Sequence, residues 1–317
     1  MSRLSFFDLH SDTVTALYYD KKSFYENDLH ISLDKITEYE HYGQIFAIFT
    51  KSALSDEEGY LAFSSVAEFF HKLIFEHSDR IAYSQSSADL SKAWMNGRAA
   101  AFLAVEDARI LAGKLERLQH MYDYGVRFLT LLWAGETCIG GSWDMVSGLT
   151  DFGKDVVREC FRLGIVPDVS HASVASTDDV IELASAYHRP IVATHSDAFS
   201  VYGHGRNLAD RHFEAIKATG GLVGINLYKH HLCDESLSLA DAETVYRHIE
   251  HYMSLGGEDT VSFGCDFDGA EFPETFKDIS SVLSLSEVLL RHNYPEHLVR
   301  KIFYENVVSF IKRTFPA

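Results

Sequence analysis

Eight short apolar runs recur along the chain, and a polar or amphipathic stretch follows each of them. The runs are rich in β-branched and aromatic residues, which favour extended strands. Near-continuous apolar runs of this length are typical of strands buried on both faces of a parallel sheet. The eight predicted strands occupy residues 5–10, 44–49, 100–106, 126–133, 164–171, 190–195, 221–228 and 260–267.

Helical patterns lie between these runs. Apolar residues recur near i, i+3, i+4 and i+7, and the predicted helices occupy residues 64–79, 153–164, 178–187, 241–256, 281–292 and 296–313. Strands that alternate with helices predict an α/β fold, and eight such units predict a closed (β/α)8 barrel of the TIM type. A doubly wound open sheet is the alternative, but the chain lacks the glycine-rich phosphate loop that usually follows its first strand.

Composition and charge exclude some classes of partner but add little to the prediction of the fold. The chain has 317 residues, of which 46% are hydrophobic and 23% charged, and no low-complexity linker or repeat divides it. We therefore expect one domain over residues 1–317. The formal net charge of -18 argues against nucleic acid and anionic membranes as partners. No apolar stretch is long enough to span a bilayer.

The cysteines and the N-terminus indicate the compartment. Cys138, Cys160, Cys233 and Cys265 lie far apart and form no CxxC pair, which suits a reducing environment. The N-terminal residues lead directly into the first predicted strand, so we expect no secretory signal. These observations predict a cytoplasmic protein.

Polar residues stand where several predicted strands end, which is where barrels of this type carry their active sites. They are His10 and Asp12 after the first strand, Glu106 after the third, His171 after the fifth, His195 after the sixth and Asp266 after the eighth. Each has a simpler explanation, such as Asp12 capping the next helix or a histidine bonding a loop carbonyl. Together they require six coincidences at one end of one barrel. We therefore predict a metal site there.

The donor set indicates which metals fit. Histidine and carboxylate without thiolate suit zinc, or manganese, iron or cobalt. Six groups exceed one tetrahedral site, so two ions bridged by a carboxylate, roughly 3.5–4 Å apart, fit better.

The segments that carry these residues resemble the membrane (renal-type) dipeptidases, zinc peptidases of the amidohydrolase-like barrels. The matching pieces are DLHSD, AVED, PDVSHAS, VATHSDAF, GRNLAD, GINLY and GCDFDG, spread over residues 8–270 in the family's order. The resemblance implies a homodimer and these roles: His10 and Asp12 bind the first zinc, Glu106 bridges both ions, His171 and His195 complete the second site, Asp266 is the acid/base beside the bridging water, Arg206 holds the substrate's terminal carboxylate, and Tyr228 lines that pocket.

One position departs from the family. Where the animal members carry a histidine that contacts the substrate, this chain has Trp133, whose indole donates one N–H but cannot titrate. We expect Trp133 to contact the substrate and to change which substrate is preferred. His204, His230 and His231 also fall near the predicted mouth, and we assign them to loops without a role.

The resemblance predicts a binuclear zinc dipeptidase that acts on dipeptides with a free C-terminal carboxylate, and it leaves open whether a C-terminal D-residue is accepted. One alternative is another two-metal barrel hydrolase that acts on lactones, cyclic amides or phosphoesters, because fold and metals do not fix the substrate. A second alternative, from a different class, is a non-catalytic barrel that binds metal or ligand. Asp266 argues against it, since a metal store needs no spare carboxylate.

Overall fold

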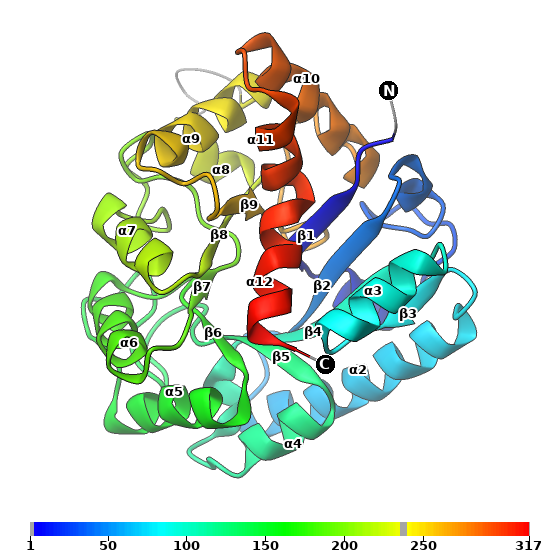
Figure 1. Ribbon diagram of the computed structural model, residues 1–317. Helices are drawn as coiled ribbons and strands as arrows, with labels where there is room; N and C mark the ends of the chain where they lie inside the picture. Colours follow the sequence, from blue (N-terminus) through cyan, green and yellow to red (C-terminus); the bar gives the residue numbers. More distant parts are fainter. Residues whose placement is uncertain (1–2, 235–239, 317) are drawn as a thin grey trace.

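Eight parallel strands form a closed barrel in the computed structural model, which describes residues 3–234 and 240–316. The strands pair in the order β2-β1-β9-β8-β7-β6-β5-β4, and a pairing of β2 with β4 closes the ring. Figure 1 shows the ring with helices around it. The prediction of a (β/α)8 barrel is confirmed, because each predicted strand overlaps one strand of the barrel.

The barrel strands are β1 (Phe6–Ser11), β2 (Tyr42–Phe49), β4 (Ala99–Glu106), β5 (Val126–Thr130), β6 (Val166–Asp168), β7 (Val192–Ala193), β8 (Leu222–Ile225) and β9 (Val261–Phe263). A further strand, β3 (Ile81–Tyr83), pairs only with the first residues of β4 and stands outside the ring. The sequence analysis missed β3 because three residues are too few to show a period.

Helices surround the barrel and lie at its two ends. They are α1 (Thr13–Asp20), α2 (Asp56–Glu76), α3 (Ser87–Met95), α4 (Arg117–Asp123), α5 (Asp151–Leu163), α6 (Val174–Tyr187), α7 (Asp210–Ala218), α8 (Lys229–Leu232), α9 (Ala242–Ser254), α10 (Leu283–Arg291), α11 (Glu296–Arg300) and α12 (Asn306–Thr314). Three 3-10 turns occupy Lys35–Glu38, Ala108–Leu111 and Ile279–Val282. Among the described residues, no helix has the length and hydrophobicity needed to cross a membrane.

Local sequence explains where several helices begin and end. The Ser55 side chain accepts from the Glu58 backbone N–H, and the Glu58 side chain accepts from the Ser55 backbone N–H. This capping box starts α2 well before the predicted position. Gly164, with φ of 80°, ends α5 in the left-handed conformation that glycine adopts without strain. The predicted helix over 296–313 is interrupted by a π-helical turn at Lys301–Glu305, which separates α11 from α12.

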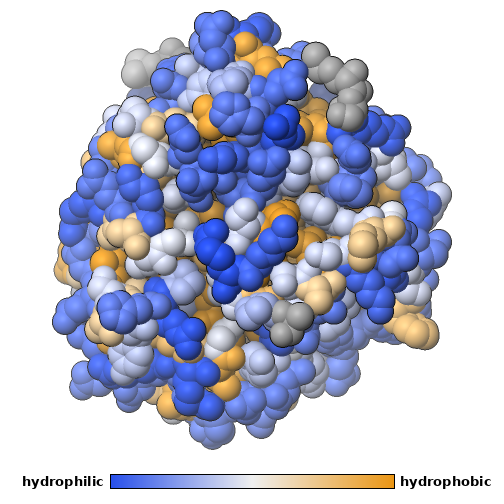
Figure 2. Space-filling view, in the orientation of Figure 1, coloured by the Kyte–Doolittle hydropathy of each residue, from blue (hydrophilic) through white to orange (hydrophobic). Residues whose placement is uncertain are grey.

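The barrel interior is apolar at its N-terminal end, and α12 covers that end. Phe7, Phe102 and Phe128 from three strands form one buried cluster with Phe310 and Val307 of α12. Figure 1 shows α11 and α12, in red, crossing the front of the ring. The face seen from this side is mainly hydrophilic, with small separate hydrophobic areas (Figure 2). The base of the barrel is therefore closed by apolar packing, which leaves the opposite end for polar groups.

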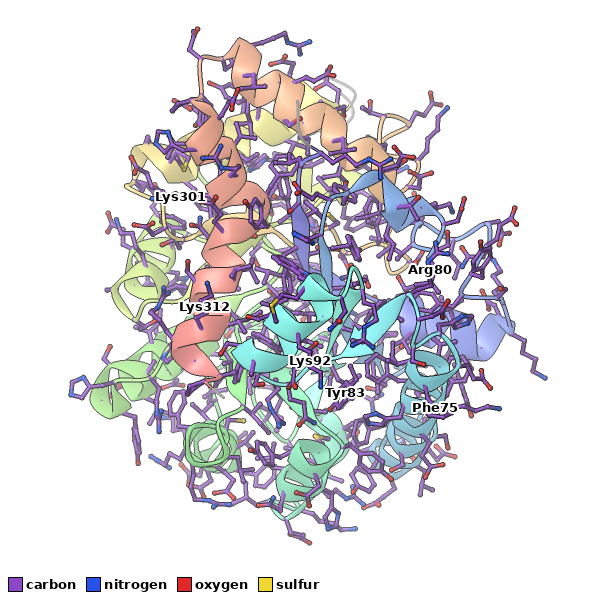
Figure 3. The ribbon with its side chains drawn as sticks, turned by 45° about the vertical axis from the view of Figure 1, so that its right-hand side comes forward. Phe75, Arg80, Tyr83, Lys92, Lys301 and Lys312 are labelled. Carbon is purple, nitrogen blue, oxygen red and sulfur yellow. The ribbon has the colours of Figure 1, made fainter. Side chains whose placement is uncertain are left out.

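The side of the molecule that carries β3 and α3 is shown in Figure 3. The labelled Tyr83 and Lys92 lie near each other there and line a surface cavity of about 370 Å³. None of the predicted site residues lines this cavity.

Candidate active site

The predicted polar side chains meet at the C-terminal mouth of the barrel. His10 lies in β1, Asp12 one residue beyond it, and Glu106 ends β4. His171, His195 and Asp266 follow β6, β7 and β9 within a few residues. They form three overlapping groups in which the possible ligand atoms lie within 4.8 Å of one another: His10, Asp12 and Glu106; Glu106, His171 and His195; His10, His195 and Asp266.

Glu106 lies at the centre of the arrangement, and its two carboxylate oxygens face different partners. Oε2 is 3.4 Å from Nε2 of His10. Oε1 is 3.0 Å from Nε2 of His171 and 3.6 Å from Nε2 of His195. The carboxylate is 2% exposed, so water does not account for these approaches. One carboxylate thus joins two separate groups of ligand atoms.

Several polar atoms at this point are buried without a hydrogen-bond partner among the described residues. They are Nε2 of His10, Oδ1 of Asp12, Oε1 of Glu106 and Nε2 of His195. An unpaired buried polar atom costs free energy, so a cluster of them calls for an explanation. The donor types, imidazole nitrogen and carboxylate oxygen, are those that zinc and related divalent metals bind. The residues therefore fit a metal centre.

Asp12 shows that helix capping does not explain the cluster. It occupies the N-cap position of α1, but its side chain makes no capping hydrogen bond. A capping aspartate would accept from a backbone N–H of the first helical turn. The Asp12 carboxylate instead faces the mouth, where it lines the central cavity.

A shift of register in β1 accounts for the direction of His10. Phe7 and Leu9 belong to the apolar interior cluster, so strict alternation would turn Ser11 to that side and His10 away from it. The pairing of β1 with β2 shifts by one residue between Asp8 and Ser11. Irregularities of this kind re-aim side chains near active sites. The alternation of His10 with Asp12 in an extended strand therefore does not by itself explain their convergence.

The protonation equilibria of the cluster are strongly shifted. Burial lowers the pKa of His10, but the nearby carboxylates of Glu106 and Asp12 outweigh burial and raise it to about 10. Burial and the charge of Glu106 raise the pKa of Asp12 well above its usual range. Burial lowers the pKa of His171 to about 4, and the Arg206 cation acts in the same direction. The cluster thus holds together groups whose pKa values are raised, such as His10 and Asp12, and a group whose pKa is lowered, His171.

Hydrogen bonds behind His195 fix its tautomer. Asp168 accepts hydrogen bonds from the hydroxyl groups of Thr130 and Thr194 and from the backbone N–H of Thr194. Because the Thr194 hydroxyl donates to Asp168, it is left to accept from Nδ1 of His195, 2.8 Å away. Nε2 of His195 then carries a free lone pair toward Glu106. Supporting groups of this kind orient metal-binding histidines.

His171 is oriented in a similar way by backbone. Its Nδ1 lies 3.1 Å from the carbonyl oxygen of Trp133, which can only accept. Nδ1 is therefore the protonated nitrogen, and Nε2 faces Glu106 as an acceptor. His171 adopts φ of 66°, a left-handed conformation that is uncommon for residues with a side chain and occurs often at functional sites.

Asp266 is held with one oxygen bound and the other open to the mouth. Oδ2 accepts from the Asn226 side chain at 3.1 Å, and Oδ1 lies 3.8 Å from Nε2 of His10. Asp266 also adopts a left-handed φ, of 64°. Gly269 completes the turn, and a Cβ there would lie 1.9 Å from Oδ2 of Asp12. A side chain at position 269 would collide with the cluster.

A cavity of about 740 Å³ opens onto these groups. Trp133, Arg206 and Tyr228 all line it. Arg206 is 5% exposed, its Nη2 donates to the carbonyl oxygen of His195, and its Nε is buried without a partner among the described residues. The Trp133 ring packs edge-on against Phe49, with 5.1 Å between centroids. The structure thus gathers the three residues predicted to contact a substrate around one space.

The sequence analysis missed three residues that contribute to the site. Asp168 and Asn226 sit in segments that it quoted, but nothing in one sequence marks a residue as the support of another. His231, which the sequence analysis assigned to a loop, lies in α8, is 7% exposed and lines the cavity. The assignment of His230 and His231 to a loop was wrong, because both lie in α8. The repeated imidazoles of residues 230–231, directly after a predicted strand, were the available signal.

The sequence is similar to that of known proteins of one family. The model of the family described as "Membrane dipeptidase (Peptidase family M19)" matches residues 1–315. Dipeptidase verJ of Clonostachys rogersoniana is 30% identical over 248 residues, which are 76% of this chain and 62% of that protein. The matched part of this chain thus spans less than two thirds of the length of this relative.

Solved structures agree in fold over the whole chain. The crystal structure of dipeptidase AC, a metallo peptidase of family M19, has a TM-score of 0.91 and 27% identity, with all of both chains covered. A metallo peptidase from Rhodobacter sphaeroides, liganded with a phosphinate mimic of the dipeptide L-Ala-D-Ala, has a TM-score of 0.91 and 26% identity, with 99% of this chain and 100% of that chain covered. These names support the prediction of a metal-dependent hydrolase. The predicted family is confirmed, and the chain belongs to the membrane dipeptidase family, peptidase family M19.

Proposed function

We propose that this protein is a binuclear zinc dipeptidase that hydrolyses dipeptides with a free C-terminal carboxylate. The observation that carries the proposal is the shared position of Glu106. Its Oε2 faces His10 and its Oε1 faces His171 and His195, so two groups of ligand atoms meet in one carboxylate. Such sharing is typical of two-metal hydrolase sites.

The chain supplies two sets of donors for the ions. His10, Asp12 and Glu106 would hold one zinc, and Glu106, His171 and His195 would hold the other, because the possible ligand atoms of each group lie within 4.8 Å of one another. Bound zinc acts as a Lewis acid and lowers the pKa of water to about 7. The buried donor atoms without partners support this assignment.

Asp266 moves the proton in this proposal. Burial raises its pKa to about 6, with the charge of Glu106 acting in the same direction and that of His10 against it. A carboxylate beside the attacking water can take a proton and return it. The Asn226 side chain binds Oδ2 and leaves Oδ1 to accept the proton of the attacking water and to pass it to the departing amine.

Arg206, Tyr228 and Trp133 bind the substrate. Arg206 is buried beside the predicted metal ligands, and its Nε–H has no partner in the described part of the chain, which suits a guanidinium that binds a carboxylate. Tyr228 lines the same cavity. The Trp133 ring lines the cavity beside Phe49 and offers a flat apolar surface, so we expect apolar side chains to be favoured there.

The stereochemistry at the C-terminal residue is part of the proposal. The Rhodobacter sphaeroides metallo peptidase of similar fold was crystallised with a mimic of L-Ala-D-Ala. We propose that this chain likewise accepts a D-residue at the C-terminal position. A cytoplasmic location and a homodimer remain predictions.

One preparation can test the proposal. The metal content is measured per chain, and turnover is followed on L,L and L,D dipeptides with free or amidated C-termini, beside a lactone and a phosphotriester. We expect about two metal ions and strong preference for the free carboxylate. Equal rates on free and amidated dipeptides would remove Arg206 from its role. Turnover confined to the lactone or the phosphotriester would favour another hydrolase, and no metal-dependent turnover would favour a non-catalytic barrel.

A further inference from the structure

His231 is a buried residue whose imidazole faces the cavity. It is 7% exposed and lines the 740 Å³ cavity together with Arg206 and Tyr228. Its ring contacts Tyr228 and His204, with centroid distances of 4.5 Å and 4.8 Å. Within residues 3–234 and 240–316, the hydrogen bonds of His231 involve its backbone only. Its ring nitrogens are not among the buried polar atoms that lack a partner, so they reach the open space of the cavity, where an entering group can bind them.

The ring is neutral at physiological pH. Burial holds the pKa of His231 far below its usual range, and the Arg206 cation lowers it further. A neutral imidazole keeps one N–H that can donate a hydrogen bond. It adds no charge beside Arg206, so the two side chains can approach the same anion without repelling each other.

The backbone of His231 is fixed independently of its ring. Its N–H donates to the carbonyl of Tyr228 at 3.0 Å, and its own carbonyl accepts from the Asn207 side chain at 2.8 Å. Asn207 directly follows Arg206 in sequence, so this bond ties α8 to the segment that carries the guanidinium. His231 is absent from the three groups of possible metal ligands among the described residues. The ring therefore belongs to the substrate side of the mouth.

We propose that His231 is a specificity-determining residue, whose imidazole N–H donates a hydrogen bond to the substrate carboxylate that Arg206 binds. The inference rests on the proposed function and deepens it, because it names a second donor for the terminal carboxylate. It does not concern the chemical step. Loss of the donor therefore weakens binding of the free acid and leaves turnover of bound substrate largely unchanged.

His231→Phe tests the proposal, because phenylalanine keeps a planar ring and removes the N–H. The matched control is His230→Phe on the same short helix, since the His230 side chain is 43% exposed and does not line the cavity. KM and kcat are measured on one dipeptide and on its C-terminal amide. We expect KM for the free dipeptide to rise on the order of tenfold in His231→Phe, with kcat changed less than threefold. We expect kcat/KM for the amide to stay at the wild-type value.

The outcomes separate the two proposals. If the wild-type enzyme shows no preference for the free dipeptide over its amide, the proposed function fails and this inference with it. If the wild type has that preference and His231→Phe leaves KM unchanged, only the role of His231 is overturned. An equal loss on the free dipeptide and the amide, or an equal effect of His230→Phe, would also overturn it, because a general defect would then explain the loss.

Discussion

The two ends of the barrel are built from the same strands and behave in opposite ways. β1 contributes Phe7 to the base and His10 to the mouth, and β4 contributes Phe102 to the base and Glu106 to the mouth. At the base, Phe7 and Phe102 belong to one cluster of buried apolar side chains. At the mouth, several buried polar atoms lack hydrogen-bond partners among the described residues.

The contrast indicates that each strand stabilises the fold at one end and supplies functional side chains at the other. Apolar burial at the base stabilises the fold, at roughly 25 cal/mol for each Å² removed from water. The mouth gathers carboxylates and imidazoles whose burial costs free energy until a cation or a substrate compensates it. Buried polar atoms without partners therefore gather at the mouth, where function needs them, although the described residues carry single ones elsewhere, such as Nε of Arg98 and Oγ of Ser262.

The largest effect should follow from Glu106→Gln, because this residue is shared by two groups of possible ligand atoms at the mouth. We expect the metal content to fall below two ions per chain and kcat/KM to fall at least about a thousandfold, because both groups of ligand atoms lose a charged donor. Elemental analysis after dialysis and dipeptide kinetics check this. Exposed Glu136 offers a control as Glu136→Gln. Two retained ions with normal kinetics would contradict the central place of Glu106.

Asp266→Asn should separate proton transfer from metal binding within the mouth. We expect the ions to stay and kcat to drop about 10²- to 10⁴-fold, because the amide retains the shape of the side chain but cannot accept the proton. Metal content and kcat are measured on the same sample. Turnover at the wild-type rate would show that another group carries the proton.

Phe310→Ala attacks the base instead. Phe310 is fully buried against the interior cluster, so we expect the free energy of unfolding to fall by about 3–5 kcal/mol. The kinetics of the folded enzyme should hardly change. Urea titration and kinetics at low temperature test both statements. Lys312→Ala, exposed on the same helix, should change stability by less than about 0.5 kcal/mol. A large loss of kcat in Phe310→Ala would break the division between the two ends.

His248→Gln should give the smallest effect, because it changes a buried histidine that is not one of the predicted metal ligands. His248 of α9 is buried; its Nδ1 accepts from the Ala198 N–H and its Nε2 lies 2.8 Å from the Leu232 carbonyl. Burial lowers its pKa from the usual 6.5 to about 4. The unfolded chain therefore binds a proton at His248 before the native state does, and stability falls as the pH drops from 6.5 toward 4.

The difference between wild type and His248→Gln isolates this contribution. Relative to the variant, the wild type should lose about 1 kcal/mol of unfolding free energy for each pH unit below 6.5. Urea titrations of both proteins between pH 4.5 and 7.5 measure the slope. A constant difference across this range would show that the ring is not held neutral by burial.

Strand positions were predictable because they depend on local patterns. All eight barrel strands carry apolar runs that stand out in the sequence, and β3 with its three residues does not. The start of α2 was misplaced because the capping box at Ser55 lies before the apolar period begins. The π-helical turn at Lys301–Glu305 has no local signal, since its residues continue the apolar period of the flanking helices.

Sequence alone determined which side chains stand at the strand ends, because the end of an apolar run is a local property and all parallel strands end on the same side of the barrel. It did not determine their directions. The register shift that turns His10, the hydroxyl bond that fixes the tautomer of His195 and the burial of His231 beside Arg206 all arise between segments far apart in the chain. Only closure of the barrel brings those segments within a few ångströms, and so only the tertiary structure decided which polar groups form one site.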